Sequence, residues 1–437
     1  MGSMFETLRN AFKIPDLRKK LAFTVVMLMI YRIGAHVPVP GLNQAEFASL
    51  LSTAGAIGGF FDLITGGAFR NATIFAMGIT PYINASIIMQ LLTVAIPALE
   101  RLQKEGEEGR KKLQQWVRYG TVMLAFVQAV ALYVGMRPAI HVIDPTSTLS
   151  NVFSFLTVTM SFTAGTAFLM WIGEKITENG IGNGISLIIF AGIVSSAPSA
   201  AGSLYLMVYS PTEGIMMSGV IWVFVILIVF IAVIAAAIWV QQGERRIPIQ
   251  YAKRVVGRKM VGGQSSHLPM KVNMAGVIPI IFAMSITALP STIIAFFFNS
   301  PTPGPFVTWI QNFQQSFGNA ILNAVLIVFF TFFYTVVQFN PVEIANNLKK
   351  NGGFIPGIRP GKPTADFITK VLYRLTWFGG IFLALITIFP NLLGMLTGVS
   401  GMWFGGTSVL ILVGVALDTV KQIESQMLMR HYKGFLD

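Results

Sequence analysis

The chain has 437 residues, of which 54% are hydrophobic and 11% are charged, with a net charge of +13 at pH 7 and no cysteine. A soluble domain carries about 25% charged residues, so this composition excludes an ordinary water-soluble protein and indicates a membrane protein. The lack of cysteine excludes disulfides, thiolate metal sites and thiol nucleophiles.

Ten apolar runs approach the length needed to cross a membrane, which is about 20 residues for a hydrocarbon core about 30 Å thick. The first contains Arg32 and the fifth is short. The first is also too long for a signal peptide and lacks a good small-residue cleavage site, so we expect it to be retained. In chain order, the predicted spans are 21–40, 72–96, 116–136, 149–172, 183–200, 215–240, 274–298, 319–340, 371–393 and 403–423.

The distribution of Lys and Arg predicts the orientation of these spans. If both termini are cytoplasmic, 28 of the 31 basic residues fall on the cytoplasmic side, and only Arg32, Arg70 and Arg137 lie elsewhere. This bias follows the positive-inside rule and supports the number of spans. Nucleic-acid binding is the alternative reading of the net charge, and loops 242–273 and 341–370 are longer than the rule requires.

A short repeat relates the second span of each half. "GITPYINAS" begins at Gly78 and "GVIPIIFAMS" begins at Gly276, and both fit G-x-x-P-x-I-x-A. Five spans per half force the second half to enter the membrane from the opposite side, as in folds built from inverted repeats. Coincidence is the alternative, since Gly and Pro are common in membrane helices.

The chemistry of the spans favours a constriction over a solute-binding site. A carrier for a small solute usually places charged or polar clusters within the membrane, whereas these spans carry few charges. The repeated segments present Ile, Val and Pro, which suit an apolar constriction that excludes water and ions. There is no nucleotide-binding G-x-x-x-x-G-K-[ST] loop and no H-E-x-x-H motif. We therefore expect no enzymatic activity, cofactor or metal.

Six motifs, in order along the chain, resemble the bacterial SecY family, the channel subunit of the Sec preprotein translocase. The resemblance extends from Met4 to the C-terminus, and only the short C-terminal tail departs from it. The motifs are "MGITPYINASII" (77–88), "EGEEGRKK" (105–112), "ITENGIGNGISLIIFAGIV" (176–194), "HLPMKVNMAGVIPIIFA" (267–283), "FIPGIRPG" (354–361) and "GGTSVLILVGVALD" (405–418).

The resemblance implies an all-α integral membrane protein with ten transmembrane helices in two inverted five-helix halves, a clamshell around a central hourglass pore. The family passes unfolded secretory chains through this pore and releases apolar segments into lipid between spans two and three and spans seven and eight. The expected division is a cytoplasmic segment 1–20, halves 21–200 and 201–423 with cytoplasmic loops 242–273 and 341–370, and a cytoplasmic tail 424–437.

The resemblance also implies a plug, a short helix at about 57–70 that closes the outer funnel. Glycines would supply its hinges, because glycine adopts backbone angles that other residues avoid. The alternative is an ordinary amphipathic helix at the membrane interface. The predicted plug residues are Phe60, Phe61, Leu63, Ile64, Gly66 and Gly67, with further hinges at Gly58 and Gly59.

The resemblance also implies a ring of bulky aliphatic side chains at the narrowest point of the pore. Isoleucine is apolar and stiff, so it can close around a moving chain without offering hydrogen bonds. The pairs Ile79/Ile83 and Ile185/Ile189 are each four residues apart and share a helix face. Taken singly, such residues more often face lipid or pack in a core. The predicted ring is Ile79, Ile83, Ile185, Ile189, Ile281 and Ile411.

The two long basic loops resemble the family's docking site for the motor ATPase SecA or the ribosome. Guanidinium groups bind both phosphates, as in ribosomal RNA, and acidic side chains. The alternative is that these residues only satisfy the charge rule. The predicted docking residues are Arg245, Arg246, Lys253, Arg254, Arg258 and Arg359.

The resemblance therefore implies the pore-forming subunit of a protein-conducting channel in the bacterial plasma membrane, with SecE and SecG as further subunits. A secondary transporter for a small solute, built on the same inverted-repeat architecture, is the alternative.

Overall fold

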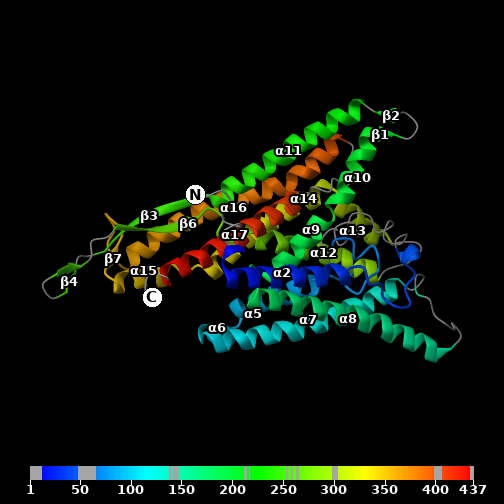
Figure 1. Ribbon diagram of the computed structural model, residues 1–437, viewed down its shortest axis with the longest axis horizontal. Coiled ribbons are helices and arrows are strands. Elements are labelled where there is room, and N and C mark those ends of the chain that lie inside the picture. Colours follow the sequence, from blue (N-terminus) through cyan, green and yellow to red (C-terminus); the bar gives the residue numbers. More distant parts are fainter. Residues whose placement is uncertain are drawn as a thin grey trace.

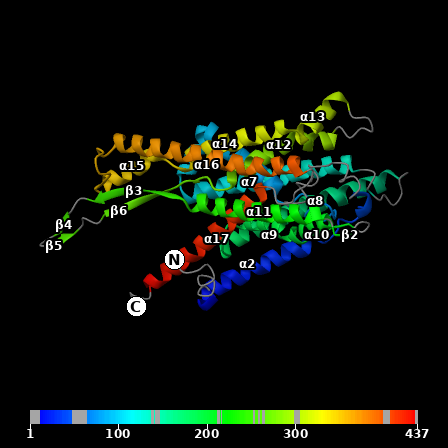
Figure 2. The same cartoon turned by 90° about the horizontal axis from the view of Figure 1, so that it is seen from above.

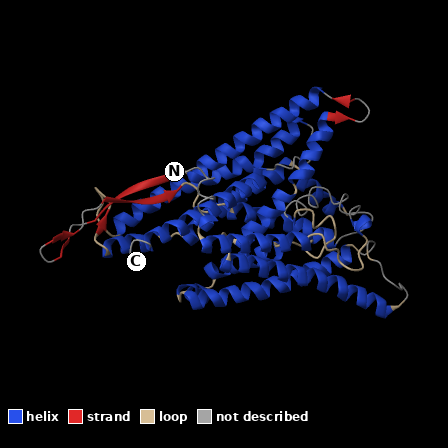
Figure 3. Ribbon diagram, viewed as in Figure 1, coloured by secondary structure: helices blue, strands red, loops and turns tan. Residues whose placement is uncertain are grey.

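The structure is a computed structural model that describes residues 12–47, 65–136, 140, 147–210, 214–215, 217–251, 254–256, 259–261, 265–297, 304–397 and 406–433. Long helices lie side by side along the long axis of the molecule (Figure 1), and a small sheet projects from one end (Figure 3). We call the end that carries strands β3, β6 and β7 the sheet end. The opposite end, which carries β1 and β2, is the hairpin end (Figure 2).

The predicted all-helical fold is confirmed, since each of the ten predicted spans overlaps at least one described helix. The helices of the first half are α2 (Pro15–Gly34), α5 (Thr80–Ala95), α6 (Pro97–Lys104), α7 (Glu107–Gly135), α8 (Thr148–Asn179), α9 (Gly184–Ser195) and α10 (Ala197–Val208). Those of the second half are α11 (Met217–Gln242), α12 (Ile278–Phe297), α13 (Pro305–Gln315), α14 (Phe317–Gln338), α15 (Pro341–Lys350), α16 (Lys362–Thr397) and α17 (Gly406–Lys433).

Not every span meets a simple criterion of length and apolarity. Among the described residues, five helical segments are long and apolar enough to cross a membrane by that criterion, and they correspond to α7, α8, α11, α14 with α15, and α16. Helix α5 makes a sixth when joined to α6, across a bend of 102°. The other spans are short, as in α9, or carry charges near one end, as in α2 and α17.

The start of α5 lies eight residues later than predicted. Gly78 adopts a positive φ of 59°, and Pro81 lies in the first turn, where it costs no hydrogen bond. The residues before it pair with the chain that follows α2, since Ile74 N–H donates to Val37 O and Val39 N–H donates to Ala72 O. These bonds replace helical ones, so α2 also ends at Gly34, before its predicted limit.

The fifth predicted span is divided in two. Helix α9 ends at Ser195 and α10 begins at Ala197, with Pro198 in its first turn. Proline has no N–H to donate to the carbonyl of Val194 and is tolerated in the first turn of a helix, which explains why a new helix begins here.

The two predicted cytoplasmic loops are largely folded, and they join in one sheet. The strands are β1 (Tyr209–Ser210), β2 (Gly214–Ile215), β3 (Glu244–Tyr251), β4 (Arg254–Val256), β5 (Lys259–Val261), β6 (Ser265–Lys271) and β7 (Gly353–Phe354). Strand β3 pairs antiparallel with β6 on one side and with β7 on the other. Because Ile247, Leu348 and Ile368 share one apolar core, loop 242–273 and loop 341–370 form a single unit at the sheet end.

The two halves meet along α12, which contacts both α5 and α7 of the first half, and where α17 packs against α9. Within the first half, an ion pair between a half-exposed arginine and a buried glutamate joins α7 to α8. Arg118 Nε lies 2.8 Å from Glu174 Oε1, and Gln114 donates to the same oxygen. Removing one partner of such a pair leaves an unpaired buried charge, so it fixes the register of these two helices.

Candidate functional site: the passage between the halves

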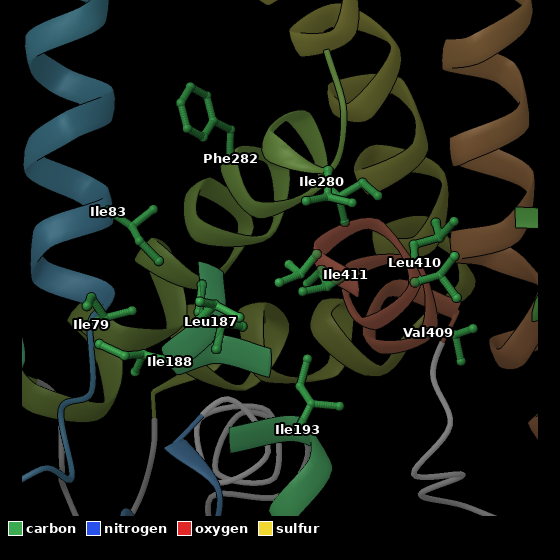
Figure 4. Packing of buried hydrophobic residues seen from close by; sticks show 14 of the residues in the cluster. Ile79, Ile83, Leu187, Ile188, Ile193, Ile280, Phe282, Val409, Leu410 and Ile411 are labelled. Atoms are coloured by element: carbon green, nitrogen blue, oxygen red, sulfur yellow. The ribbon is translucent and has the colours of Figure 1, made fainter. Parts of the chain in front are cut away.

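The predicted isoleucine ring lies within one apolar cluster at the contact between the halves. Four of its members are buried, namely Ile79, Ile83, Ile189 and Ile411, and Ile185 and Ile281 are half-buried against the same cluster. Figure 4 shows Ile79 and Ile83 of α5 on one side of this cluster and Ile411 of α17 on the other, with Leu187 and Ile188 of α9 between them. The structure thus brings all six residues together from four helices.

Local geometry explains how α5 and α9 present these side chains. Ile79 is the N-cap of α5, so the turn at Gly78 directly sets its position. Helix α9 is fixed by Asn183, whose side chain accepts a hydrogen bond from Ser186 N–H. Burying an isoleucine side chain contributes about 1.5–3 kcal/mol, so the cluster stabilises the closed contact between the halves.

The hairpin end of the cluster is covered by the segment Thr65–Gly67. Three residues hold this segment against two helices, and we call them the clasp: Tyr31, Arg32 and Ser195. Tyr31 donates its hydroxyl proton to Thr65 O at 3.1 Å. Arg32 Nη1 donates to Gly66 O at 3.1 Å and to Ser195 Oγ at 2.9 Å. The clasp therefore joins α2 and α9 to the base of the predicted plug.

The predicted plug is described only at its C-terminal end. Phe60, Phe61, Leu63 and Ile64, with Gly58 and Gly59, lie outside the described residues. Gly66 and Gly67 have φ values of 64° and 87°, which are strained for other residues. Residues 66–70 consequently form turns, so the predicted helix at 57–70 does not extend past Thr65 in the described part.

The sheet end of the cluster opens into a polar cavity of about 340 Å³. Val277 and Val415 belong both to the cavity wall and to the cluster, so the cavity borders the apolar residues directly. Its polar lining includes the carboxamides of Asn183, Gln241, Asn273, Gln338 and Gln422.

The predicted docking residues lie at the sheet end, where the structure describes them. Arg245, Arg246 and Arg359 are exposed, and Arg246 pairs with Glu244 at 2.6 Å. Arg254 lies on β4. Lys253 and Arg258 fall outside the described residues. Arg359 is carried by a turn whose neighbour Ile355 is buried, so the turn is anchored while the guanidinium remains accessible.

The sequence did not predict the clasp or the carboxamide lining. Arg32 did give a signal, because it is one of three basic residues that break the charge rule and it lies in an apolar run. A charged residue at that depth indicates a specific partner. The carboxamides gave no such signal, because Asn and Gln at helix ends are common and their spatial grouping depends on the tertiary fold.

Comparison with known proteins identifies the family. The SecY family model matches residues 73–420. The protein translocase subunit SecY of Halalkalibacterium halodurans is 46% identical over 435 residues, covering 99% of this chain and 100% of the relative. The protein of the same name from Bacillus subtilis is 47% identical over 443 residues, again covering 99% of this chain and 100% of the relative.

Solved structures show the same fold at low sequence identity. A structure described as a protein-conducting channel matches with a TM-score of 0.57 and 20% identity, over 94% of this chain and 92% of the other. A second, whose description concerns the plug domain of SecY and the membrane seal, matches with a TM-score of 0.61 and 19% identity over the same shares. Sec61 in a canine ribosome–channel complex matches with a TM-score of 0.54 and 18% identity, also over the same shares. With the family model and the curated relatives, these matches establish that the chain belongs to the SecY family.

Proposed function

We propose that this chain is the pore-forming subunit of a protein-conducting channel, which moves unfolded secretory polypeptides across a membrane and releases transmembrane segments into lipid. The observation that carries the proposal is the apolar cluster between the two halves, with a polar cavity on one side and the Thr65–Gly67 segment on the other. An apolar constriction excludes water and ions by dewetting, yet it parts without breaking hydrogen bonds.

The family's parts map onto the described elements as follows. The isoleucine ring is the constriction, and the segment held by the clasp is the base of the plug. The contacts of α12 with α5 and α7 are the closed seam through which apolar segments leave. Among the described residues, Glu174 is the one buried charged side chain, and it pairs with Arg118. This scarcity of buried charge disfavours a carrier for a small solute, because such sites rely on intramembrane charges or polar groups.

The sheet end is the cytoplasmic end in this proposal, the membrane is the bacterial plasma membrane, and both termini are cytoplasmic. The exposed arginines at this end suit two partners, the ribosome and the motor ATPase SecA, because guanidinium groups bind phosphates and carboxylates. SecE and SecG are the proposed further subunits. One structural relative is a channel in a ribosome complex, which supports the ribosome as a partner.

Transport in reconstituted vesicles distinguishes the two functions. The channel complex, with its partner subunits and SecA, should move a secretory polypeptide into the lumen only when ATP is supplied. A carrier would instead show saturable uptake of a small solute without SecA. Solute uptake of that kind, with no polypeptide transport, would refute the proposal.

The docking surface is tested at Arg359, which is exposed on an anchored turn. Arg359→Glu places a negative charge where an acidic or phosphate partner would bind, and we expect SecA-driven export to fall about tenfold or more. Arg359→Lys keeps the charge but loses the bidentate geometry of the guanidinium, so we expect an intermediate loss of export. Normal export from Arg359→Glu, with normal membrane insertion, would remove Arg359 from the docking surface.

A further inference from the structure

The cavity at the sheet end has the size and position of a binding site. Its volume of about 340 Å³ lies within the range of ligand pockets, which begins at about 300 Å³. Its wall combines Asn183 of the first half with α12, α14 and α17 of the second. Because Val277 and Val415 belong to both, the cavity adjoins the apolar cluster on this side.

Two carboxamides of the lining are held by their oxygen atoms. Gln422 Oε1 accepts a hydrogen bond from Gly182 N–H at 2.7 Å, and Asn183 Oδ1 accepts one from Ser186 N–H at 3.2 Å. A carboxamide that is held by its oxygen keeps two N–H donors on the other atom. Within the part of the chain that the structure describes, neither NH₂ group has an acceptor. Each side chain is therefore a positioned donor.

Gln241 supplies a third donor without an acceptor. Its Nε2 atom is buried and has no hydrogen-bond partner among the described residues. The side chain lies at the end of α11, against Gly414 of α17, and lines the same cavity. A buried unpaired donor costs free energy unless a ligand or water supplies the acceptor. Because Nε2 is buried, donation from Gln241 to a ligand in the cavity requires a local movement of its side chain or of α17.

The charge of the lining restricts the ligand to a neutral one. Its charged members, Lys271 and Asp418, are exposed and opposite in sign. Among the described residues, the lining therefore forms neither an anion site nor a cation site. The lining also holds one buried unpaired acceptor, Asn273 Oδ1, which a donor or water would satisfy. The partner that suits the three donors is a neutral hydrogen-bond acceptor. Every residue of an unfolded polypeptide, including proline, carries one such group, the main-chain carbonyl.

We propose that Gln241, Gln422 and Asn183 donate hydrogen bonds to main-chain carbonyl oxygens of an extended polypeptide immediately before it enters the isoleucine ring. This inference rests on the proposed function and adds the chemical group that is recognised. Recognition of the backbone is independent of sequence, as a channel for many polypeptides requires. The ring offers no hydrogen bond, so the cavity is where the chain is held between the steps driven by the motor, and once ATP is removed this hold slows backward release.

The test measures backward release of an arrested polypeptide. The channel complex is reconstituted in vesicles, a secretory polypeptide is driven halfway by SecA and ATP, and ATP is then removed. In the variant Gln241→Met/Gln422→Met, the side chains keep their length but lose the donors. We expect backward release to be roughly threefold to tenfold faster than in the wild type, the effect of losing one or two ordinary hydrogen bonds.

Gln426→Met is the matched control. Gln426 lies one turn after Gln422 on the same helix, accepts a hydrogen bond from Lys20 and does not line the cavity. We expect it to release the polypeptide at the wild-type rate. Equal release from the wild type and the double variant would overturn the inference and indicate a cavity that holds water only.

A second measurement leaves the channel unchanged. Semisynthetic polypeptides carry, at the arrested segment, a run of alanine, a run of proline, or a run in which alanine is replaced by lactic acid, so that ester bonds replace amide bonds. Proline keeps the carbonyl but has no N–H, and an ester carbonyl is a weaker acceptor. We expect the proline run to be retained like alanine and the ester run to be released faster.

Equal release of all three segments would overturn the inference, as would a proline run released like the ester run. A wild-type channel that accepts none of these polypeptides would overturn the proposed function as well. Transport with unaltered release would count against the carboxamides alone.

Discussion

The starts of α5 and α12 are the same structure in two different surroundings. Each helix follows a glycine with nearly equal positive φ, 59° at Gly78 and 63° at Gly276, and each has a proline in its first turn. The repeat seen in the sequence is therefore repeated in backbone geometry. Since α5 starts at the hairpin end and α12 at the sheet end (Figures 1 and 2), the two copies face opposite sides of the cluster.

The surroundings of the two glycines differ. A side chain at Gly78 would meet Thr65 Cγ2 at 2.8 Å, because the segment held by the clasp packs against this turn. A side chain at Gly276 would meet nothing within 4 Å, and Gly276 lines the polar cavity. The entrance beside Gly78 is thus packed against Thr65, whereas the one beside Gly276 faces the cavity. The two copies of the repeat therefore share their backbone geometry and differ in the residues that lie against them.

The apolar cluster between these two entrances gives the largest expected effect. Ile83→Ser/Ile281→Ser places hydroxyl groups in the constriction, which removes the dewetting barrier. We expect the resting conductance of the purified complex in planar bilayers to rise about tenfold or more. Ile221→Ser, on the exposed face of α11, is the control, and we expect no leak from it. Unchanged conductance in the double variant would exclude these residues from the seal.

The entrance beside Gly78 is tested through the clasp. Arg32→Met removes the bonds to Gly66 O and Ser195 Oγ, so the segment that covers the cluster is held less firmly. We expect resting conductance to rise roughly threefold to tenfold, in line with the loss of charged hydrogen bonds. Arg32→Lys keeps the charge but loses the bidentate geometry of the guanidinium, and it should give a smaller increase in resting conductance. If both variants conduct like the wild type, the clasp does not hold the entrance closed.

Substitution of the two glycines should give the smallest effect, and it compares the two helix starts directly. Alanine at either position must adopt a left-handed backbone conformation, which costs about 1–2 kcal/mol of conformational free energy. Gly78→Ala also clashes with Thr65, so we expect it to lower the thermal unfolding temperature in detergent more than Gly276→Ala does. Thr65→Ser removes the Cγ2 methyl and keeps the hydroxyl that accepts from Phe69 N–H.

The variant Gly78→Ala/Thr65→Ser should therefore unfold at nearly the temperature of Gly276→Ala. If the second substitution restores nothing, or if the two single variants are equally stable, then the packing of Thr65 against Gly78 does not distinguish the two entrances.

The sequence predicted the parts of the molecule that follow from hydrophobicity and local backbone rules. The ten spans are apolar runs, and the repeat is visible because Gly78 and Gly276 need a positive φ while Pro81 and Pro279 suit a first helical turn. It did not predict where α5 begins, because the bonds between 37–39 and 72–74 depend on a tertiary contact.

The candidate site was predicted in its apolar part and not in its polar part. The isoleucines were selected by helical spacing and family resemblance, and they gather in one cluster. The clasp and the carboxamide lining join residues far apart in the chain, such as Gly182 and Gln422, and no local pattern encodes those meetings. Buried polar groups form hydrogen bonds with the partners that the tertiary fold brings into contact with them.

The claim that a polypeptide passes through the apolar cluster is tested most directly by photocrosslinking. A photoreactive residue is placed at position 83, 281 or 221 of the reconstituted complex, and a secretory polypeptide is arrested in transit. Positions 83 and 281, from opposite halves, should both label the polypeptide, while position 221 should label lipid. Labelling of lipid alone from 83 and 281, with the polypeptide in transit, would contradict the account.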